Sequence, residues 1–126
     1  MNIYIVIFAG GGFGAVLRFL VSSLVSRHHP GSAFPWGTLA VNLTGAFLIG
    51  LIIELGALKL NLSQTSRAFL VTGILGGFTT FSAFSLETTL LLSKGAYAPA
   101  ASYIALSVIA TVALVFAAML LMRQIV

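Results

Sequence analysis

The sequence predicts an all-helical integral membrane protein with four transmembrane helices. Of its 126 residues, 60% are hydrophobic and only 6% are charged, whereas soluble domains carry roughly 25% charged residues. The mean hydropathy is +1.15. Four apolar stretches are each close to the ~20 residues that a helix needs to cross ~30 Å of hydrocarbon. They cover residues 3–25, 36–55, 69–92 and 97–122, and we expect one transmembrane domain over residues 1–126.

The first stretch resembles a secretory signal peptide only superficially. No Lys or Arg precedes the apolar run, the run exceeds the roughly 7 to 15 residues of a signal peptide, and Arg18 interrupts it. We interpret it as a retained transmembrane helix. Small residues four positions apart, such as Gly10 with Gly14 and Gly73 with Gly77, indicate close helix packing, although the pattern does not say which helices meet.

The second stretch places two polar side chains on one face. Thr38 and Asn42 are four residues apart, and a helix brings such positions above one another. A polar side chain at membrane depth either bonds a neighbouring helix or faces a solute path. The pattern in this stretch leaves both interpretations open.

The third stretch predicts a broken helix. Gly76 and Gly77 precede Thr79, Thr80 and Ser82, and all of these residue types weaken a helix through backbone entropy or competing side-chain hydrogen bonds. Non-helical backbone at membrane depth is tolerated only where protein or a water-filled cavity satisfies its polar groups. We therefore expect a break near the middle of this helix, beside a possible ion path.

The fourth stretch carries a stripe of hydroxyl groups. Tyr103, Ser107 and Thr111 follow at four-residue spacing. No side chain on these polar faces is ionised, while the rings of Phe81 and Phe84 have electropositive edges. Weak donors and ring edges suit a small anion, which must lose water to enter the path and still leave it.

The remaining chemistry of the sequence excludes several classes of protein. There is no cysteine, and Glu54 and Glu87 each lie near a helix end, where we expect exposure to the membrane interface. No nucleophile, base and orienting group occur together, so we predict that the protein is not an enzyme. The absence of a eukaryotic targeting signal suits the bacterial inner membrane.

The cationic residues favour neither side of the membrane. With four crossings, Lys59, Arg67 and Arg123 lie on the side of the termini and Arg27 and Lys94 on the opposite side, which Arg18, toward the far end of the first helix, would join. The count is three against three, or three against two without Arg18. A protein with one fixed orientation usually shows a clear excess facing the cytoplasm. We therefore hypothesise dual topology, with copies inserted both ways pairing as an antiparallel two-fold dimer.

Three motifs resemble the bacterial fluoride channel family often called Fluc, whose members are small exporters that relieve cytoplasmic fluoride toxicity. These motifs are "GGGFGAVLRF", "WGTLAVNLTGAFLIG" and "GILGGFTTFSAFSLE", and the resemblance spans essentially the whole chain. It implies a fluoride-selective channel that works passively as an antiparallel dual-topology homodimer with two pores. It also implies a structural Na⁺ at the centre of the dimer interface, held by the backbone carbonyls of Gly76 and Thr79 from both subunits.

The resemblance further implies roles for the polar and aromatic side chains. Phe81 and Phe84 would turn ring edges toward fluoride, and Asn42 would donate its amide to the ion. The expected polar track consists of Tyr103, Ser107 and Thr111, and the additional pore hydroxyls are Thr38, Thr80 and Ser82. Arg18 and Glu87 match family positions near the aqueous ends, where a charged vestibule or a structural pairing is expected.

Two alternatives from other classes remain open at this point. A small proton-coupled multidrug exporter also has four helices and dual topology, but it would need a carboxylate in the first helix, and residues 1–26 contain no Asp or Glu. A purely structural membrane subunit would use the polar stripes as contacts between helices.

Overall fold

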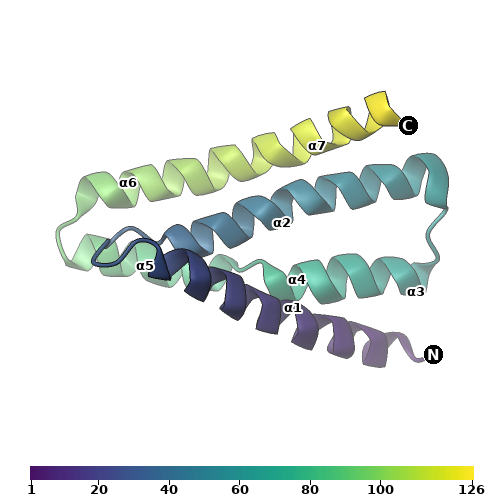
Figure 1. Ribbon diagram of the computed structural model, residues 1–126, viewed down its shortest axis with the longest axis horizontal. Helices are drawn as coiled ribbons and strands as arrows, with labels where there is room; N and C mark the ends of the chain where they lie inside the picture. The colour runs from purple at the N-terminus through teal and green to yellow at the C-terminus, as the bar shows by residue number, and fades with distance from the viewer.

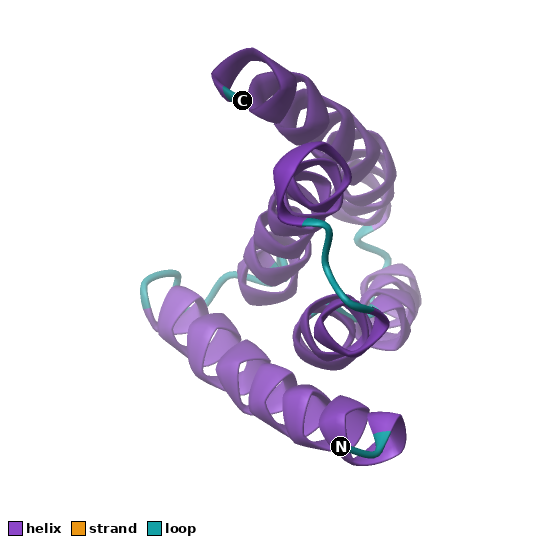
Figure 2. Ribbon diagram, turned by 90° about the vertical axis from the view of Figure 1, so that its right-hand side faces the viewer, coloured by secondary structure: helices purple, strands orange, loops and turns teal.

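Four long helices make up the structure, a computed structural model that describes residues 1–126 (Figures 1 and 2). All four are long and apolar enough to cross a membrane, and no strand is present. They run over Ile3–Arg27, Trp36–Leu60, Gln64–Ser93 and Tyr97–Ile125. The predicted all-α fold with four membrane-spanning helices is confirmed. Each helix extends a few residues past the apolar stretch that predicted it.

The first helix is a single regular element, α1 (Ile3–Arg27). The Asn2 side chain caps its N-terminus by accepting a hydrogen bond of 2.9 Å from the amide of Tyr4. The connection that follows contains Gly31 at φ 76°, a conformation that glycine adopts without strain. The chain reverses there and enters α2 (Trp36–Leu55).

The second and fourth helices each contain a wider, π-helical segment. Helix α2 continues without interruption into η1 (Gly56–Leu60) and stops at Asn61, whose φ of 40° is left-handed. The fourth helix consists of α6 (Tyr97–Ala105), η3 (Leu106–Ala110) and α7 (Thr111–Ile125). Short π-helical segments inside α-helices often occur at functional sites.

The third helix is interrupted near its middle, as predicted. Its elements are α3 (Gln64–Arg67), η2 (Ala68–Leu75), α4 (Gly76–Phe78) and α5 (Phe81–Ser93). Between α4 and α5, Thr79 and Thr80 are extended, with ψ angles of 159° and 123°. The helical hydrogen-bond ladder stops at these two residues.

Glycines determine which helices meet. A Cβ on Gly14 of α1 would overlap the backbone carbonyl of Ile74, and one on Gly77 would overlap the carbonyl of Gly11. Helix α1 therefore packs backbone to backbone against η2 and α4. On the other side of the molecule, α2 packs along α7, where a Cβ on Gly50 would lie 2.6 Å from a carbonyl oxygen of α7.

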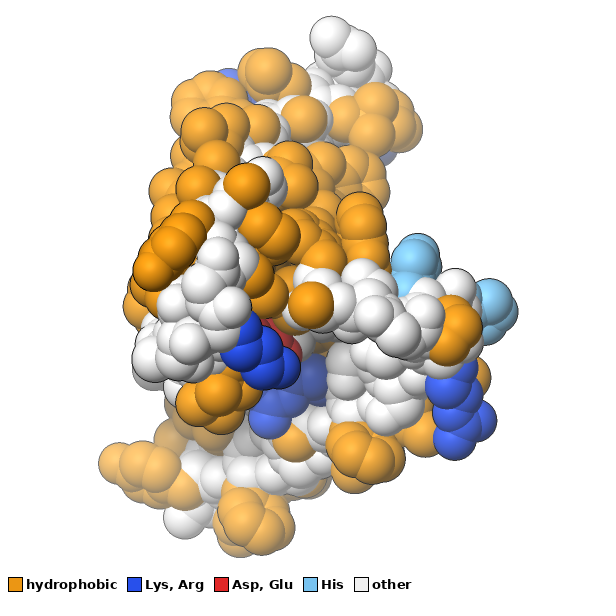
Figure 3. Space-filling view, turned by 90° about the vertical axis from the view of Figure 1, so that its left-hand side faces the viewer, with side chains coloured by type: hydrophobic (Ala, Val, Ile, Leu, Met, Phe, Trp, Pro, Cys, Tyr) orange, Lys and Arg blue, Asp and Glu red, His pale blue; other side chains and the backbone are white.

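The two ends of the molecule match the arrangement expected for four crossings. Both termini lie at the same end as the connection between α2 and α3, and the other two connections lie at the opposite end (Figure 1). Figure 3 shows cationic and histidine side chains at that opposite end, with hydrophobic side chains over much of the flanks. An apolar flank between polar ends is the surface expected for a protein immersed in a bilayer.

The expectation that Glu54 is exposed at the interface was wrong. Glu54 is buried, and the guanidinium of Arg123 on α7 donates hydrogen bonds to both of its carboxylate oxygens. Glu54 lies at the end of α2, and α7 packs alongside it, so the approach of the two helices covers the carboxylate. A buried carboxylate requires such a partner, and this ion pair connects the ends of α2 and α7.

Candidate functional site

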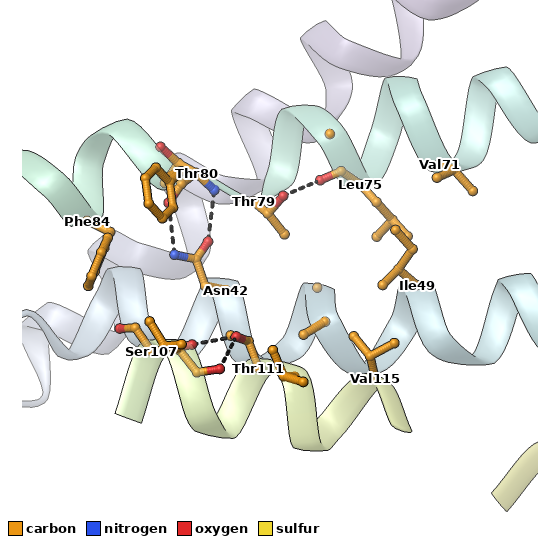
Figure 4. A pocket seen from close by; sticks show the side chains of 16 residues that line it. Asn42, Ile49, Val71, Leu75, Thr79, Thr80, Phe84, Ser107, Thr111 and Val115 are labelled. Carbon is orange, nitrogen blue, oxygen red and sulfur yellow. Dashed lines mark hydrogen bonds between the residues drawn. The ribbon is translucent and has the colours of Figure 1, made fainter. Parts of the chain in front are cut away.

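A groove of about 470 Å³ opens between α2, the broken third helix and the fourth helix (Figure 4). A mostly apolar recess with a few placed polar groups is the usual form of a small-ligand site. It is lined by Asn42, Gly45, Ala46, Ile49, Val71, Leu75, Gly76, Thr79, Thr80, Phe81, Phe84, Ser107, Val108, Thr111, Val112 and Val115. The groove therefore combines residues from three of the four predicted helices, and many of these residues carry the polar and aromatic groups singled out in the sequence.

The break at Thr79 and Thr80 forms part of one wall of this groove. The amide of Thr79 still bonds the carbonyl of Leu75 at 3.0 Å, but the amide of Thr80 turns away from the helix. No backbone hydrogen bond across the break ends on the carbonyl of Gly76. Since backbone groups at membrane depth need partners, neighbouring side chains must supply them.

Asn42 supplies two of the missing partners. Its Nδ2 donates to the carbonyl of Thr80 at 2.9 Å, and its Oδ1 accepts from the amide of Thr80 at 2.8 Å (Figure 4). The donor and acceptor of the same residue thus fix the orientation of the amide group. One Nδ2–H is left over beside the groove.

Two further residues bring neighbouring helices to the break. A guanidinium nitrogen of Arg18, on α1, lies 3.5 Å from the carbonyl oxygen of Thr79. On α2, a Cβ on Gly45 would overlap the methyl group of Thr79, so glycine is required for this close approach. Sequence reasoning did not assign Gly45 a role, although its position three residues after Asn42, on the same face, was a usable signal.

Thr80 caps α5. Its hydroxyl accepts a hydrogen bond of 3.2 Å from the amide of Ala83, which is the usual bond of a helix N-cap. The hydroxyl of Ser82 is exposed and lies 3.3 Å from that of Thr80. Thr80 thus supports the second half of the broken helix, and Ser82 does not line the groove.

Three aromatic rings follow one another at one end of the groove. The ring centroids of Phe81 and Phe84 are 5.4 Å apart, and those of Phe84 and Tyr103 are 5.1 Å apart in an edge-to-face arrangement. Phe84 and Tyr103 are buried, whereas 76% of Phe81 is exposed. The ring of Phe81 therefore faces outward from a single chain, although Phe81 and Phe84 both line the groove.

Glu87 joins three helices and is only partly exposed. The hydroxyl of Thr38 donates to one carboxylate oxygen at 2.7 Å, and the hydroxyl of Tyr103 donates to the other at 2.6 Å. Glu87 is half-buried. Thr38 and Tyr103, both singled out as pore hydroxyls, lie together at this carboxylate and do not line the groove.

The fourth helix contributes one hydroxyl that the protein leaves unpaired. Ser107 is 8% exposed, and its Oγ is the only buried side-chain polar atom without a hydrogen-bond partner. Thr111 differs, because its hydroxyl donates to the carbonyls of Ser107 and Val108 at the end of η3. Both residues line the groove, so its polar wall offers the Ser107 hydroxyl as a free donor.

Backbone oxygens at the break are candidate ligands for a cation. The protein has no group of three or more His, Cys, Asp or Glu side chains able to hold a metal ion. The carbonyls released at the break, those of Gly76 and Thr79, belong to residues that line the groove.

Comparison with known proteins assigns the chain to a family. The family described as "CrcB-like protein, Camphor Resistance (CrcB)" matches residues 5–119. The chain belongs to the CrcB family. All groove residues, from Asn42 to Val115, fall inside this match. Together with the relatives described next, the match confirms the family resemblance inferred from the three motifs.

Several CrcB relatives are similar over nearly the whole chain. A protein of Rhizobium meliloti named fluoride-specific ion channel FluC is 48% identical over 126 residues, which cover 100% of both chains. A protein of Agrobacterium fabrum with the same name is 52% identical over 115 residues, 91% of each chain. A third, from Rhodospirillum centenum, is 45% identical over 123 residues, covering 98% of this chain and 97% of its own. With four membrane-spanning helices, this CrcB protein is a multi-pass protein of the bacterial inner membrane.

Proposed function

We propose that the protein is a fluoride-specific ion channel that exports cytoplasmic fluoride passively and so reduces fluoride toxicity. The observation that carries this proposal is the 48% identity, over every residue of both chains, with a relative named for that activity. The groove supports it, because it collects weak hydrogen-bond donors and aromatic rings without an ionised side chain. Such a lining can replace the hydration shell of a small anion without trapping it.

We propose that the groove forms part of the fluoride path. The free hydroxyl of Ser107 and the remaining Nδ2–H of Asn42 would donate to the ion, and Phe81 and Phe84 would present ring edges to it. Thr111 would extend this polar track. Thr80 would line the path and cap α5. Tyr103 and Thr38 would act beside the path through Glu87, which they bond, and Ser82 would lie at its edge.

The same proposal assigns roles to the charges of Arg18 and Glu87. Arg18 carries a positive charge next to the break, where it would attract an anion. Glu87 is held by two hydroxyl donors, so its charge is partly compensated. We propose a charged vestibule for Arg18 and a structural pairing for Glu87.

The driving force needs no coupled reaction. Under an inside-negative membrane potential, roughly 2.3 kcal/mol per 100 mV drives each anion outward. Hydrogen fluoride is a weak acid that crosses membranes in its neutral form, so fluoride accumulates inside a cell when the outside is acidic. A passive channel is then sufficient for export.

We propose that two copies pair in an antiparallel homodimer with dual topology. Because Arg18 reaches the break rather than a helix end, the cations near the membrane surfaces number three on one side and two on the other, still without a clear bias. The exposed ring of Phe81 and the released carbonyl of Gly76 are groups that a second copy would cover.

The backbone carbonyl oxygens at the break are suitable ligands for a structural sodium ion. Backbone carbonyl oxygens are neutral ligands of the kind that monovalent cations take in channels. We propose that the Gly76 and Thr79 carbonyls of two copies would hold Na⁺ between them. When bound, the ion would supply positive charge near the anion path.

The rival classes lack the groups they need. The chain is not an enzyme, because its relatives carry the name of an ion channel, which moves an ion without making or breaking a covalent bond. A proton-coupled multidrug exporter is not favoured, since α1 has no carboxylate. The two acidic side chains are already engaged, Glu54 with Arg123 and Glu87 with Thr38 and Tyr103.

Efflux from reconstituted vesicles tests the proposal. Vesicles that contain the purified protein and are loaded with fluoride should release the fluoride rapidly once an ionophore lets the counter-cation leave with it. A fluoride-selective electrode measures the release. Vesicles loaded with chloride, and vesicles without protein, are the controls. Release of neither anion would favour a structural subunit, and release that requires a pH gradient would favour a proton-coupled exporter.

A further inference from the structure

We infer that Asn42 is a positioning residue, which holds the broken helix in shape and thereby fixes where α5 begins. The inference deepens the proposed function, on which it relies only for the expected effect on ion flux. Asn42 would thus have two roles: it shapes the protein through Thr80, and its remaining N–H is free to bind an ion.

The contact between Asn42 and Thr80 has the form of a pairing between two strands. Thr80 has φ −153° and ψ 123°, close to the dihedral angles of an antiparallel β-strand. A strand residue exchanges one donor and one acceptor with its partner, and the amide of Asn42 does the same, at 2.9 and 2.8 Å. Thr80 has no neighbouring strand, and the side chain of Asn42 on α2 makes the two hydrogen bonds that such a strand would make.

Asparagine suits this position better than other side chains of similar size. Its amide carries both a donor and an acceptor, whereas ionised aspartate only accepts hydrogen bonds and serine is too short to span both groups. The distance is set by the backbone of α2, which approaches the break closely at Gly45, one turn further on. A Cβ at Gly45 would overlap the methyl group of Thr79.

The effect of this clamp reaches the aromatic rings through Thr80. With its backbone held, the hydroxyl of Thr80 accepts from the amide of Ala83 and starts α5. Phe81 is the first residue of α5, and Phe84 lies one turn later. The orientation of both rings therefore depends on where the helix starts, and Asn42 fixes that point through the backbone of Thr80.

Amide hydrogen exchange, measured by NMR on the full chain in lipid nanodiscs, tests the clamp directly. Replacing Asn42→Ser removes both bonds to Thr80, so exchange of the Thr80 amide should accelerate about 10- to 100-fold, the factor expected for a lost hydrogen bond. Exchange at Ala83, the residue bonded to the cap, should accelerate as well. The matched control is Thr44→Val on the same helix, because Thr44 is exposed and bonds only the carbonyl of Ala40; it should change neither rate.

A second variant covers the case in which Asn42→Ser does not fold. Asn42→Asp keeps an oxygen that accepts from the Thr80 amide but loses the donor to the Thr80 carbonyl, so the Thr80 amide should stay protected in this variant. Acceleration at Thr80 in Asn42→Asp, or unchanged exchange at Thr80 and Ala83 in Asn42→Ser, would overturn the inference.

Fluoride efflux from vesicles, measured on the same variants, separates the two proposals. We expect slower efflux in Asn42→Ser together with faster exchange at Thr80. Slower efflux with unchanged exchange would mean that Asn42 acts on the ion alone, against the inference. If the unaltered protein released no fluoride, the proposed function would fail, while the exchange rates would still decide whether Asn42 holds the break.

Discussion

Ser107 and Asn42 differ in how much of their hydrogen-bonding capacity the fold uses. Asn42 uses one donor and one acceptor in hydrogen bonds with Thr80. The hydroxyl of Ser107, beside the same groove, is buried without a partner. A native structure rarely leaves a buried polar group unsatisfied, so each exception calls for an explanation. A ligand that enters the groove would explain Ser107.

Replacing Ser107→Ala should slow fluoride efflux without destabilising the protein. Removing a hydroxyl that bonds nothing leaves no other group unpaired, so the temperature of unfolding should change little. A hydrogen bond to a charged group is worth about 1.5–3 kcal/mol, and efflux should fall about tenfold or more. Ser93→Ala, at an exposed serine of α5, is the control. Unchanged efflux in Ser107→Ala would remove this hydroxyl from the path.

Replacing Phe81→Ile should also slow efflux while the protein stays folded. The ring is 76% exposed in the single chain, so its loss opens no cavity within the chain. Interactions specific to an aromatic ring are worth about 0.5–1.5 kcal/mol, which predicts a fall of roughly 2- to 10-fold in electrode-measured efflux. Phe116→Ile, on the 68% exposed ring of α7, is the matched control. Equal efflux in both variants would contradict the proposed role of Phe81.

The sequence predicted which polar residues share a helix face, but not which of them form hydrogen bonds with one another. Four-residue spacing placed Tyr103, Ser107 and Thr111 on one helix face, yet only Ser107 and Thr111 line the groove. Tyr103 instead bonds Glu87 from the neighbouring helix. Periodicity describes a single helix, whereas these bonds depend on how two helices meet, which no pattern within one helix specifies.

At the scale of helices, close packing of α1 against the broken helix depends on individual glycines. Gly14 faces the carbonyl of Ile74, where an added Cβ would overlap it, while Gly12 has no atom within 4 Å of such a Cβ. Two glycines of the same helix, two residues apart, thus have opposite environments.

This difference yields a matched pair of variants. Gly14→Ala should destabilise the protein by about 1–3 kcal/mol, because the backbones must move apart to accommodate the methyl group. Gly12→Ala should stabilise it slightly, by about 0.5–1 kcal/mol, since alanine loses less entropy in a helix. Denaturant unfolding in detergent micelles measures both changes. A similar change in the two variants would contradict the packing of α1 on η2 and α4.

The break in the third helix could be predicted from sequence, but the π-helical segments could not. Gly76, Gly77 and the hydroxyl residues after them weaken a helix locally, and local weakness is visible in sequence. The wider turns of η2 and η3 occur in mostly apolar runs, "AFLVTGIL" and "LSVIA", each of which carries a single hydroxyl residue. Nothing in their composition separates a π-helical turn from an α-helical one, because helix contacts across the molecule decide between them.

At the scale of the whole molecule, the distribution of positive charge is as important as the fold for the orientation of the protein in the membrane. The sequence predicted four crossings with both termini at one end, and the structure has this arrangement (Figure 1). It also predicted nearly equal positive charge at the two ends, which underlies the proposal of two oppositely inserted copies. The ion pair of the buried Glu54 with the exposed Arg123 was not predicted, since the two residues are far apart in the sequence.

Added charge should force one orientation and thereby abolish function. Gln64→Lys, Thr65→Lys and Gln124→Lys together place three lysines at the end that carries the termini, and all three positions are exposed. Because Lys and Arg excess stays in the cytoplasm, every copy should insert one way, and antiparallel pairs should not form. Cysteine accessibility on intact cells measures orientation, and survival in fluoride measures function.

A variant biased the opposite way provides the control. Ala33→Lys, Ser93→Lys and Ala98→Lys mark exposed positions at the other end, and its copies should insert in reverse. Each biased variant alone should leave cells sensitive to fluoride, and expressing both together should restore resistance. Full resistance from one biased variant, with all copies shown to face one way, would contradict the antiparallel dimer.

The central claim, a passive and fluoride-selective path, is tested most directly by the reversal potential of the purified protein in a planar lipid bilayer. With a tenfold fluoride gradient, equal chloride on both sides and no pH gradient, the current should reverse at the fluoride equilibrium potential, about 59 mV from zero. A current that reverses near zero would mean that the path does not select fluoride. A current that appears only with a pH gradient would mean that transport is coupled to protons, and either result would contradict the account.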